Sequence, residues 1–241
     1  MLKKNNKIIF TGGSGRFGNV LKKIDSKYRI YFPSRKKLDI TKFKKAENYI
    51  TIIKPKFIIH AAALSRPMNI HDKNIIKSID TNIIGTSNIV KICSKLRIKL
   101  IYFSTNYVYP SKSGNYNEND SLLPRNTYAW SKLGGETAVQ MYKNSLILRI
   151  CMTEKPFTHK KVFTNMRTNF MFHEDMAKNL FKLINLKGII NVGGKTQSAF
   201  NFAKKHNPRV KKIFVKKKDK DEFPLNSTMN ISKFRKVINK K

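Results

Sequence analysis

The sequence is poor in cysteine and has no long apolar run. Cys93 and Cys151 are the only two cysteines among 241 residues, too few for a disulfide framework or, by themselves, for a metal site. No hydrophobic run approaches the ~20 residues that cross a bilayer. The N-terminus also lacks an apolar segment followed by a small-residue cleavage site. We therefore expect no membrane-spanning helix, no signal peptide and a reduced, cytoplasmic setting.

Acidic residues are scarce as well. The chain has 14 Asp and Glu against 50 Lys and Arg, which gives a formal net charge of +36. Such a charge is the first sign of a nucleic-acid-binding protein, but 40 of these cations are Lys and only 10 are Arg, beside 24 Asn and 28 Ile. Phosphate and base recognition favours Arg, whose planar fork binds bidentately, whereas Lys, Asn and Ile share AT-rich codons. We interpret the charge as compositional drift and expect no specific nucleic-acid partner.

Apolar segments alternate with amphipathic ones through the first 150 residues. Their lengths and spacing predict strands at 7–11, 28–32, 56–63, 98–105 and 145–150, and helices from the glycine-rich turn to about residue 25 and at 41–54, 72–94 and 127–143. Strands that alternate with helices predict an α/β fold with a Rossmann-type, doubly wound parallel sheet. The polar stretch 106–126 has no regular pattern, and loops of that length are usually functional or disordered.

The pattern weakens after residue 150. Helices are predicted at 173–184, 198–206 and over the last ten residues, strands at 188–192 and 209–215, and a charged loop at 216–222. We therefore divide the chain into a Rossmann domain, 1–150, and a small C-terminal lobe, 151–241. Residues around 173–194 are expected to return partly to the main sheet.

Three glycines follow the first predicted strand. Gly12, Gly15 and Gly18 form GxxGxxG at the start of a helix. Glycines allow a tight turn and let the backbone approach a pyrophosphate at the helix N-terminus. Because strand, glycines and helix occur in this order, the pattern predicts a dinucleotide site rather than a plain turn.

The second predicted strand indicates which dinucleotide is bound. NAD-binding proteins usually have a carboxylate at the end of this strand, and NADP-binding proteins have a basic residue there. The chain instead has Ser34, Arg35 and Lys36, and Arg16 in the glycine turn could reach the same phosphate. We therefore predict NADP(H) in preference to NAD(H).

Tyr128 and Lys132 form a YxxxK pattern on the helix predicted at 127–143, where residues four apart share one face. An ammonium beside a phenol lowers the phenol's pKa from the usual ~10, so Tyr128 could exchange a proton with a carbonyl oxygen near neutral pH. Thr105 ends the preceding strand, at the edge where parallel sheets bind ligands, and would hydrogen-bond the same carbonyl. These three residues are the predicted catalytic set.

Further motifs extend these patterns. TGGSGRFG, LDIT, HAAALS, NIIGTSNI, STNYVYPSKSGNYNENDSLLPRNTYAWSKLGGE, LILR and NVGG occur in this order between about residues 7 and 194. With them the chain resembles the extended short-chain dehydrogenases/reductases, and within these the dTDP-4-dehydrorhamnose reductase-like family of sugar-nucleotide enzymes. The resemblance implies NADPH-dependent reduction of the C4 keto group of a 4-keto-6-deoxy sugar nucleotide, in nucleotide-sugar and surface polysaccharide biosynthesis. It also implies that the C-terminal lobe binds the substrate.

The same resemblance implies roles for individual residues. Asp39 would hydrogen-bond the adenine, Ala61–Ala63 would lie beside the nicotinamide ribose, and Asn82 would steady the backbone of the active site. The implied substrate contacts are Ser104, Thr105, Asn106 and Tyr128. The full set of predicted cofactor-binding residues is Gly12, Gly15, Arg16, Phe17, Gly18, Ser34, Arg35, Asp39, Ile40, Ala61, Ala62, Ala63, Asn82, Tyr128 and Lys132. Among the few acids, those that recur in the motifs are Asp39, Glu118, Asp120 and Glu136.

The chain also departs from the family pattern. Asn106 replaces the usual Asp of STDYVF, Tyr109 replaces its Phe, and the segment after Arg149 lacks the expected sugar-binding pattern. These differences bear on the identity of the sugar more than on the chemistry.

His60 ends a buried strand, and we interpret it as a packed, hydrogen-bonded imidazole. The other histidines have no metal-ligand spacing, so we predict no metal site.

Three other functions stay open at this point. Extended reductases include sugar-nucleotide 4-epimerases and 4,6-dehydratases that hold NAD tightly, and the SRKK segment favours the reductase over these. Relatives also serve as non-catalytic, NADP-binding regulatory subunits, against which Tyr128 and Lys132 argue. Nucleic-acid binding rests on the charge alone. The expected partner is a nucleotide sugar, with no membrane partner, and a homodimer is one candidate for the oligomeric state.

Overall fold

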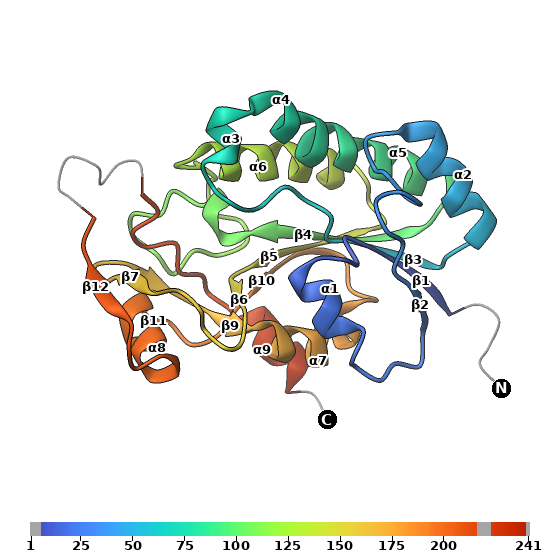
Figure 1. Ribbon diagram of the computed structural model, residues 1–241. Coiled ribbons are helices and arrows are strands. Elements are labelled where there is room, and N and C mark those ends of the chain that lie inside the picture. The colour runs from blue at the N-terminus through green and yellow to red at the C-terminus, as the bar shows by residue number, and fades with distance from the viewer. Residues whose placement is uncertain (1–5, 216–222, 240–241) are drawn as a thin grey trace. The chain divides into compact units, whose positions relative to one another are not determined.

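The computed structural model describes residues 6–215 and 223–239 (Figure 1). The predicted charged loop at 216–222 lies outside the described residues. The chain divides into two compact units: unit 1 comprises Met1–Ser104, Ser131–Leu148 and Ile184–Gly188, and unit 2 comprises Thr105–Trp130, Arg149–Leu183 and Ile189–Lys241. The domain boundary expected at residue 150 stays a prediction.

The central sheet has six parallel strands. They are β1 (Lys7–Thr11), β2 (Arg29–Tyr31), β3 (Phe57–His60), β4 (Lys99–Thr105), β5 (Ser145–Ile150) and β10 (Gly188–Val192), in the order β10-β5-β4-β3-β1-β2. In register, Ile9 of β1 lies opposite Tyr31 of β2 and Ile58 of β3. Strands β3, β4 and β5 are buried along their whole length, as expected for apolar strands covered on both faces. The Rossmann-type α/β fold is confirmed.

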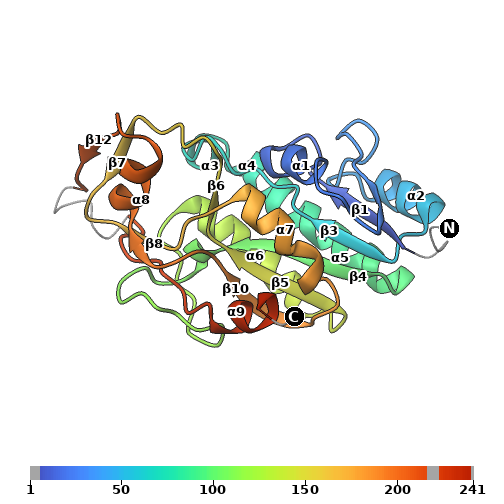
Figure 2. The same ribbon diagram turned by 90° about the horizontal axis from the view of Figure 1, so that it is seen from below.

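Helices cover both faces of the sheet within unit 1. Helices α2 (Phe43–Ile53) and α5 (Gly85–Leu96) pack against each other on one face, together with α6 (Thr127–Gln140), which belongs to unit 1 from Ser131 onward (Figure 1). The short helix α1 (Arg16–Leu21) lies on the opposite face (Figure 2). The buried residues Ala46, Ile50, Ile89 and Ile92 recur at helical spacing on α2 and α5, so amphipathic periodicity sets which face of each helix meets the core.

The helix predicted at 72–94 is confirmed from Ile75 onward, but it starts after a break at Asn74 and contains a π-turn. The segment comprises α3 (Ile70–Lys73) before the break, and then α4 (Ile75–Ser78), the π-helix η1 (Ile79–Ile84) and α5, which follow one another without interruption. Asn74 interrupts it with φ −143° and ψ 76°, and its side chain caps α4 by accepting from the Lys77 N–H at 2.9 Å. A side-chain cap offers the backbone an alternative to helix continuation, and apolar periodicity alone does not reveal such a break.

Unit 2 contains short elements around a small aromatic core. Three strand pairs occur: β6 (Met152–Thr153) with β9 (Met171–Phe172), β7 (Lys161–Phe163) with β12 (Lys211–Ile213), and β8 (Arg167–Thr168) with β11 (Gln197–Ser198). The helices are the 3-10 helix η2 (Asn106–Val108), α7 (His173–Leu183), α8 (Ala199–His206) and α9 (Ser232–Ile238). Phe157, Phe202, Ala203 and Val210 form the core, with Phe170 and Phe172 packed on it.

Candidate functional site

The glycine turn lies against the end of strand β3. Gly12 has φ +79°, a backbone conformation that favours glycine. A Cβ at Gly12 would lie 2.9 Å from the Ala62 nitrogen, and one at Gly18 would lie 2.7 Å from the Gly13 carbonyl oxygen. The turn therefore has no room for side chains at these positions. It brings Gly12 directly beside Ala61 and Ala62, two of the residues predicted to bind cofactor.

His60 ties this turn to the strand end and to helix α5. The imidazole is fully buried, with Nδ1 2.7 Å from Thr11 Oγ1 and Nε2 3.1 Å from Thr86 Oγ1. Thr11 Oγ1 also accepts from the Ala62 N–H at 3.2 Å. Burial, together with the charge of Lys132, lowers the pKa of His60 to about 3, so the ring is neutral near pH 7. The expected packed, hydrogen-bonded histidine is confirmed.

A basic pocket of about 390 Å³ follows strand β2. Its lining residues are Arg35, Lys36, Lys37, Asp39, Lys42 and Lys45. Asp39 is the single acid in this lining, and it accepts hydrogen bonds from the Thr41 N–H at 3.0 Å, the Thr41 hydroxyl at 2.8 Å and Arg35 Nε at 3.3 Å. Burial alone would raise the pKa of Asp39, but these hydrogen bonds lower it below its usual value. The pocket thus joins strong positive charge to a fixed carboxylate.

Asn82 connects the loop after β3 with helix α6. It is buried in the π-helix, where its Oδ1 accepts from the Leu64 N–H at 2.8 Å. Its Nδ2 donates to the Leu64 carbonyl at 2.9 Å and to Ser131 Oγ at 2.8 Å. Single π-turns inside helices are frequent at functional sites. Ser131 directly precedes Lys132 on α6. Asn82 therefore anchors this helix beside one of the residues predicted to act in catalysis.

Lys132 is buried on helix α6, one turn after the half-buried Tyr128. The residue is only 3% exposed, and its Nζ lies 4.2 Å from the centroid of the Tyr102 ring on β4. The Tyr102 hydroxyl donates to the Lys132 carbonyl at 3.1 Å. Burial lowers the pKa of Lys132 to about 7, and the Glu136 carboxylate opposes that shift. The ammonium therefore gains or loses its proton near neutral pH.

The end of strand β4 carries the other predicted substrate contacts. Ser104 donates its hydroxyl to the buried Glu136. Thr105 is buried, and its Oγ1 accepts from the Tyr107 N–H at 3.3 Å. Asn106 donates from Nδ2 to the Ser227 carbonyl at 3.2 Å and to Ser227 Oγ at 2.7 Å. An Asp could not donate to that carbonyl, which gives a physical reason for the departure at position 106.

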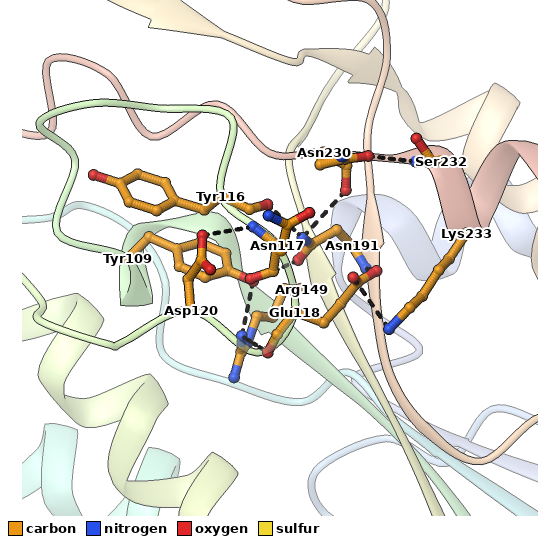
Figure 3. A network of polar contacts seen from close by, with 10 residues as sticks. All are labelled: Tyr109, Tyr116, Asn117, Glu118, Asp120, Arg149, Asn191, Asn230, Ser232 and Lys233. Carbon is orange, nitrogen blue, oxygen red and sulfur yellow. Dashed lines mark hydrogen bonds and ion pairs between the residues drawn. The ribbon is translucent and has the colours of Figure 1, made fainter.

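The long loop 106–126 is held by a buried polar network in unit 2 (Figure 3). Arg149 Nη1 donates to the Tyr109 hydroxyl at 2.8 Å and to the Glu118 carbonyl at 3.0 Å. The Tyr109 hydroxyl lies 2.8 Å from Asn191 Oδ1, and the Asn191 N–H donates to Glu118 Oε1 at 3.1 Å. Lys233 of α9 pairs with Glu118 Oε2 at 3.3 Å. This loop is therefore an ordered one.

Sequence reasoning named Glu118 among the scarce acids but missed its partners. Tyr116 stacks on Tyr109 with ring centroids 4.9 Å apart, and its carbonyl accepts from Asn191 Nδ2 at 2.9 Å. Asp120 caps the loop by accepting from the Asn117 N–H at 2.9 Å. Arg149 and Asn191 lie in β5 and β10, far from the loop in sequence, so no local pattern could have indicated these contacts.

The predicted site residues lie in both units. Unit 1 contains the glycine turn, Arg35, Asp39, Asn82 and Lys132, and unit 2 contains Thr105, Asn106 and Tyr128. Among the described residues, no group of three or more His, Cys, Asp or Glu side chains could hold a metal ion. No helix within 6–215 or 223–239 has the length and apolarity needed to cross a membrane.

The family model described as RmlD substrate binding domain matches residues 6–173. Among curated relatives, a dTDP-4-dehydrorhamnose reductase from Aggregatibacter actinomycetemcomitans is 27% identical over 199 residues, which cover 80% of this chain and 63% of that protein. Methionine adenosyltransferase 2 subunit beta from Xenopus laevis is 35% identical over 98 residues, or 40% of this chain and 29% of that one. The chain thus spans less than two thirds of the length of these relatives.

A solved structure extends the likeness to nearly the whole fold. The crystal structure of dTDP-4-dehydrorhamnose reductase from Bacillus anthracis in complex with NADP superposes with a TM-score of 0.84 at 24% identity. The match covers 96% of this chain and 92% of that one. At this identity the likeness shows the shared fold.

Proposed function

Because the chain belongs to the RmlD substrate binding domain family, we propose that it is an NADPH-dependent reductase of a 4-keto-6-deoxy sugar nucleotide. Its relative from Aggregatibacter is named as a reductase of this kind. The observation that carries the proposal is helix α6, where Tyr128 is followed one turn later by the buried Lys132. A lysine buried beside an aromatic ring is costly to a fold, and a catalytic role accounts for its retention.

The residues of unit 1 fit a dinucleotide with an extra phosphate. The glycine turn leaves no space for a Cβ at Gly12 or Gly18, which supports close approach of a pyrophosphate to the backbone. The basic pocket that contains Arg35 supports binding of a 2′-phosphate, since a guanidinium binds phosphate oxygens bidentately. The Asp39 carboxylate, fixed by Thr41, would accept from the adenine amino group. When bound, NADPH supplies the hydride that reduces C4.

The chain's own residues would protonate the carbonyl oxygen of the substrate and hold it in position. Tyr128 would donate its phenolic proton to that oxygen as it gains negative charge, and Thr105 would hold it by a hydrogen bond. The Lys132 ammonium would stabilise the tyrosinate that remains. Asn82 would keep α6 in position through Ser131. Solvent then returns a proton to Tyr128, which completes the cycle.

The test is NADPH oxidation with dTDP-4-dehydro-6-deoxy-L-mannose and related 4-keto sugar nucleotides, with NADH run in parallel. We expect turnover that prefers NADPH, and a loss of at least ~10²-fold in kcat for Tyr128→Phe, the lower range for general acid–base catalysis. Tyr49→Phe is the matched control, because Tyr49 is half-buried on α2 and should leave turnover unchanged. Full activity of Tyr128→Phe would rule out the mechanism.

A second candidate follows from the likeness to an adenosyltransferase beta subunit. In that case the chain would bind NADP and associate with an enzyme without turning over a sugar nucleotide. Co-purification with a stoichiometric partner, together with no turnover on any 4-keto sugar, would favour it. The cofactor released from the purified protein separates the remaining alternatives, since tightly held NAD indicates an epimerase or dehydratase and exchangeable NADPH a reductase.

A further inference from the structure

Glu136 is a fully buried acid in a chain that has few acids. It is 0% exposed and lies on α6 one turn after Lys132. One carboxylate oxygen accepts from the Ser104 hydroxyl at the end of β4, and the other accepts from Gln140 Nε2 at 3.3 Å. A buried carboxylate is strongly unfavourable unless it is hydrogen-bonded or paired with a cation. A cation lies one helical turn away, on the same face of the helix.

Two other side chains that interact with Lys132 carry no negative charge near pH 7. His60 of β3 interacts with it electrostatically but stays neutral near pH 7, and Tyr102 of β4 presents its ring face to the ammonium. Asn82 of the π-helix and Thr86 of α5, which lie against Ser131 and Gly135 on the same helix, are uncharged. Among these neighbours, Glu136 is the group whose charge opposes the effect of burial.

We propose that Glu136 is a positioning residue of the active site: its carboxylate keeps the Lys132 ammonium charged and, through Ser104, ties α6 to the end of strand β4. This inference deepens the proposed function and rests on it for its catalytic consequence. The carboxylate acts through Lys132 and does not contact substrate. Its hydrogen bond with Ser104 joins the helix that carries Tyr128 and Lys132 to the strand that ends in Thr105.

Glu136→Gln tests the charge while keeping the shape. The amide oxygen can still accept from Ser104, so a purely structural role would be largely preserved. Without the negative charge, Lys132 loses its proton at lower pH. We expect the alkaline limb of the kcat profile to move down by about 1 pH unit or more, the lower range for loss of a nearby opposite charge. Glu136→Asp should restore the wild-type limb, and Glu47→Gln, which removes an acid on α2 that pairs with Lys95, should not shift it.

A direct titration separates this inference from the proposed function. The Lys132 side-chain carbon next to Nζ can be followed by NMR in the protein without cofactor, assigned by its absence in Lys132→Met. We expect its titration midpoint to fall in Glu136→Gln, whether or not the protein turns over a sugar nucleotide. An unchanged midpoint overturns the inference even in an active enzyme, and an inactive wild-type protein with a shifted midpoint overturns only the reductase proposal.

A wild-type measurement covers the case in which Glu136→Gln does not fold. The Glu136 carboxyl carbon reports its own ionisation. The inference requires this carboxyl to be ionised across the pH range in which Lys132 titrates. A Glu136 carboxyl that is still protonated between pH ~6 and ~8, well above the ~4.3 of an unperturbed glutamate, would overturn it without any variant.

Discussion

The contact between helix α6 and the π-helix predicts opposite effects for two adjacent glycines. A Cβ at Gly135 would collide with the Asn82 carbonyl oxygen and lie 2.9 Å from the Tyr102 hydroxyl, and neither group can move without displacing a helix or a strand. A Cβ at Gly134 would lie 2.8 Å from Ile83 Cδ1, the free end of a half-buried side chain that can rotate away. Both Gly→Ala changes gain ~1 kcal/mol of helix propensity.

The difference between the two variants isolates the packing cost. Overpacking of a tight contact costs ~1–3 kcal/mol, so Gly135→Ala should be less stable than Gly134→Ala by about that amount. Urea unfolding at equilibrium measures the difference, and the midpoint temperature should be lower by ~2–4 °C for each kcal/mol. Gly134→Ala should be as stable as the wild type or more so. If the two alanine variants proved equally stable, α6 would not approach the π-helix as closely as described.

Two further predictions concern buried polar groups. Below pH ~6.5 the unfolded chain protonates His60 while the folded chain, with a pKa of about 3, does not, so acidification from pH ~6.5 to ~4.5 should cost up to ~2.7 kcal/mol of unfolding free energy through this residue. His60→Gln should weaken that pH dependence in urea titrations, and an unaltered slope would argue against a neutral, buried imidazole. Asn106→Asp replaces a donor to the Ser227 carbonyl with a second acceptor and should destabilise by ~1–3 kcal/mol at pH 7, less at low pH. If the loss of stability in Asn106→Asp were the same at pH 7 and at low pH, the hydrogen bond from Asn106 to the Ser227 carbonyl would be contradicted.

The parts of the fold that sequence reasoning predicted well are those with a local signal. Strands β5 and β10 have the predicted bounds, 145–150 and 188–192, because each is a short apolar run between polar turns. The GxxGxxG turn and the YxxxK helix were likewise readable, since each motif is contained within a few residues. Contacts between distant segments were not predicted. The pairing of β7 with β12, for example, joins residues about 50 positions apart, and no periodicity encodes that pairing.

In the candidate site, too, the sequence motifs indicated individual residues but not their contacts. Asn82 was singled out by its motif, but its contacts with Leu64 and Ser131 depend on a π-turn that the apolar spacing does not predict. Glu136 was visible as one of four acids, among the 14 of a basic chain, that recur in the motifs. Its burial beside Ser104 required β4 and α6 to be assembled. Scarcity of acids was therefore a usable signal for the position, and the fold supplied the partner.

As the proposed reductase, the chain would transfer a hydride from NADPH to the C4 ketone of a sugar nucleotide. Incubation with NADPH carrying deuterium at the transferable position, followed by NMR of the sugar product, tests it most directly. We expect one deuterium at C4 of the reduced sugar, with stoichiometric formation of NADP and near-complete loss of transfer in Tyr128→Phe. A sugar product without deuterium at C4, or no consumption of NADPH with any 4-keto sugar nucleotide, would contradict it.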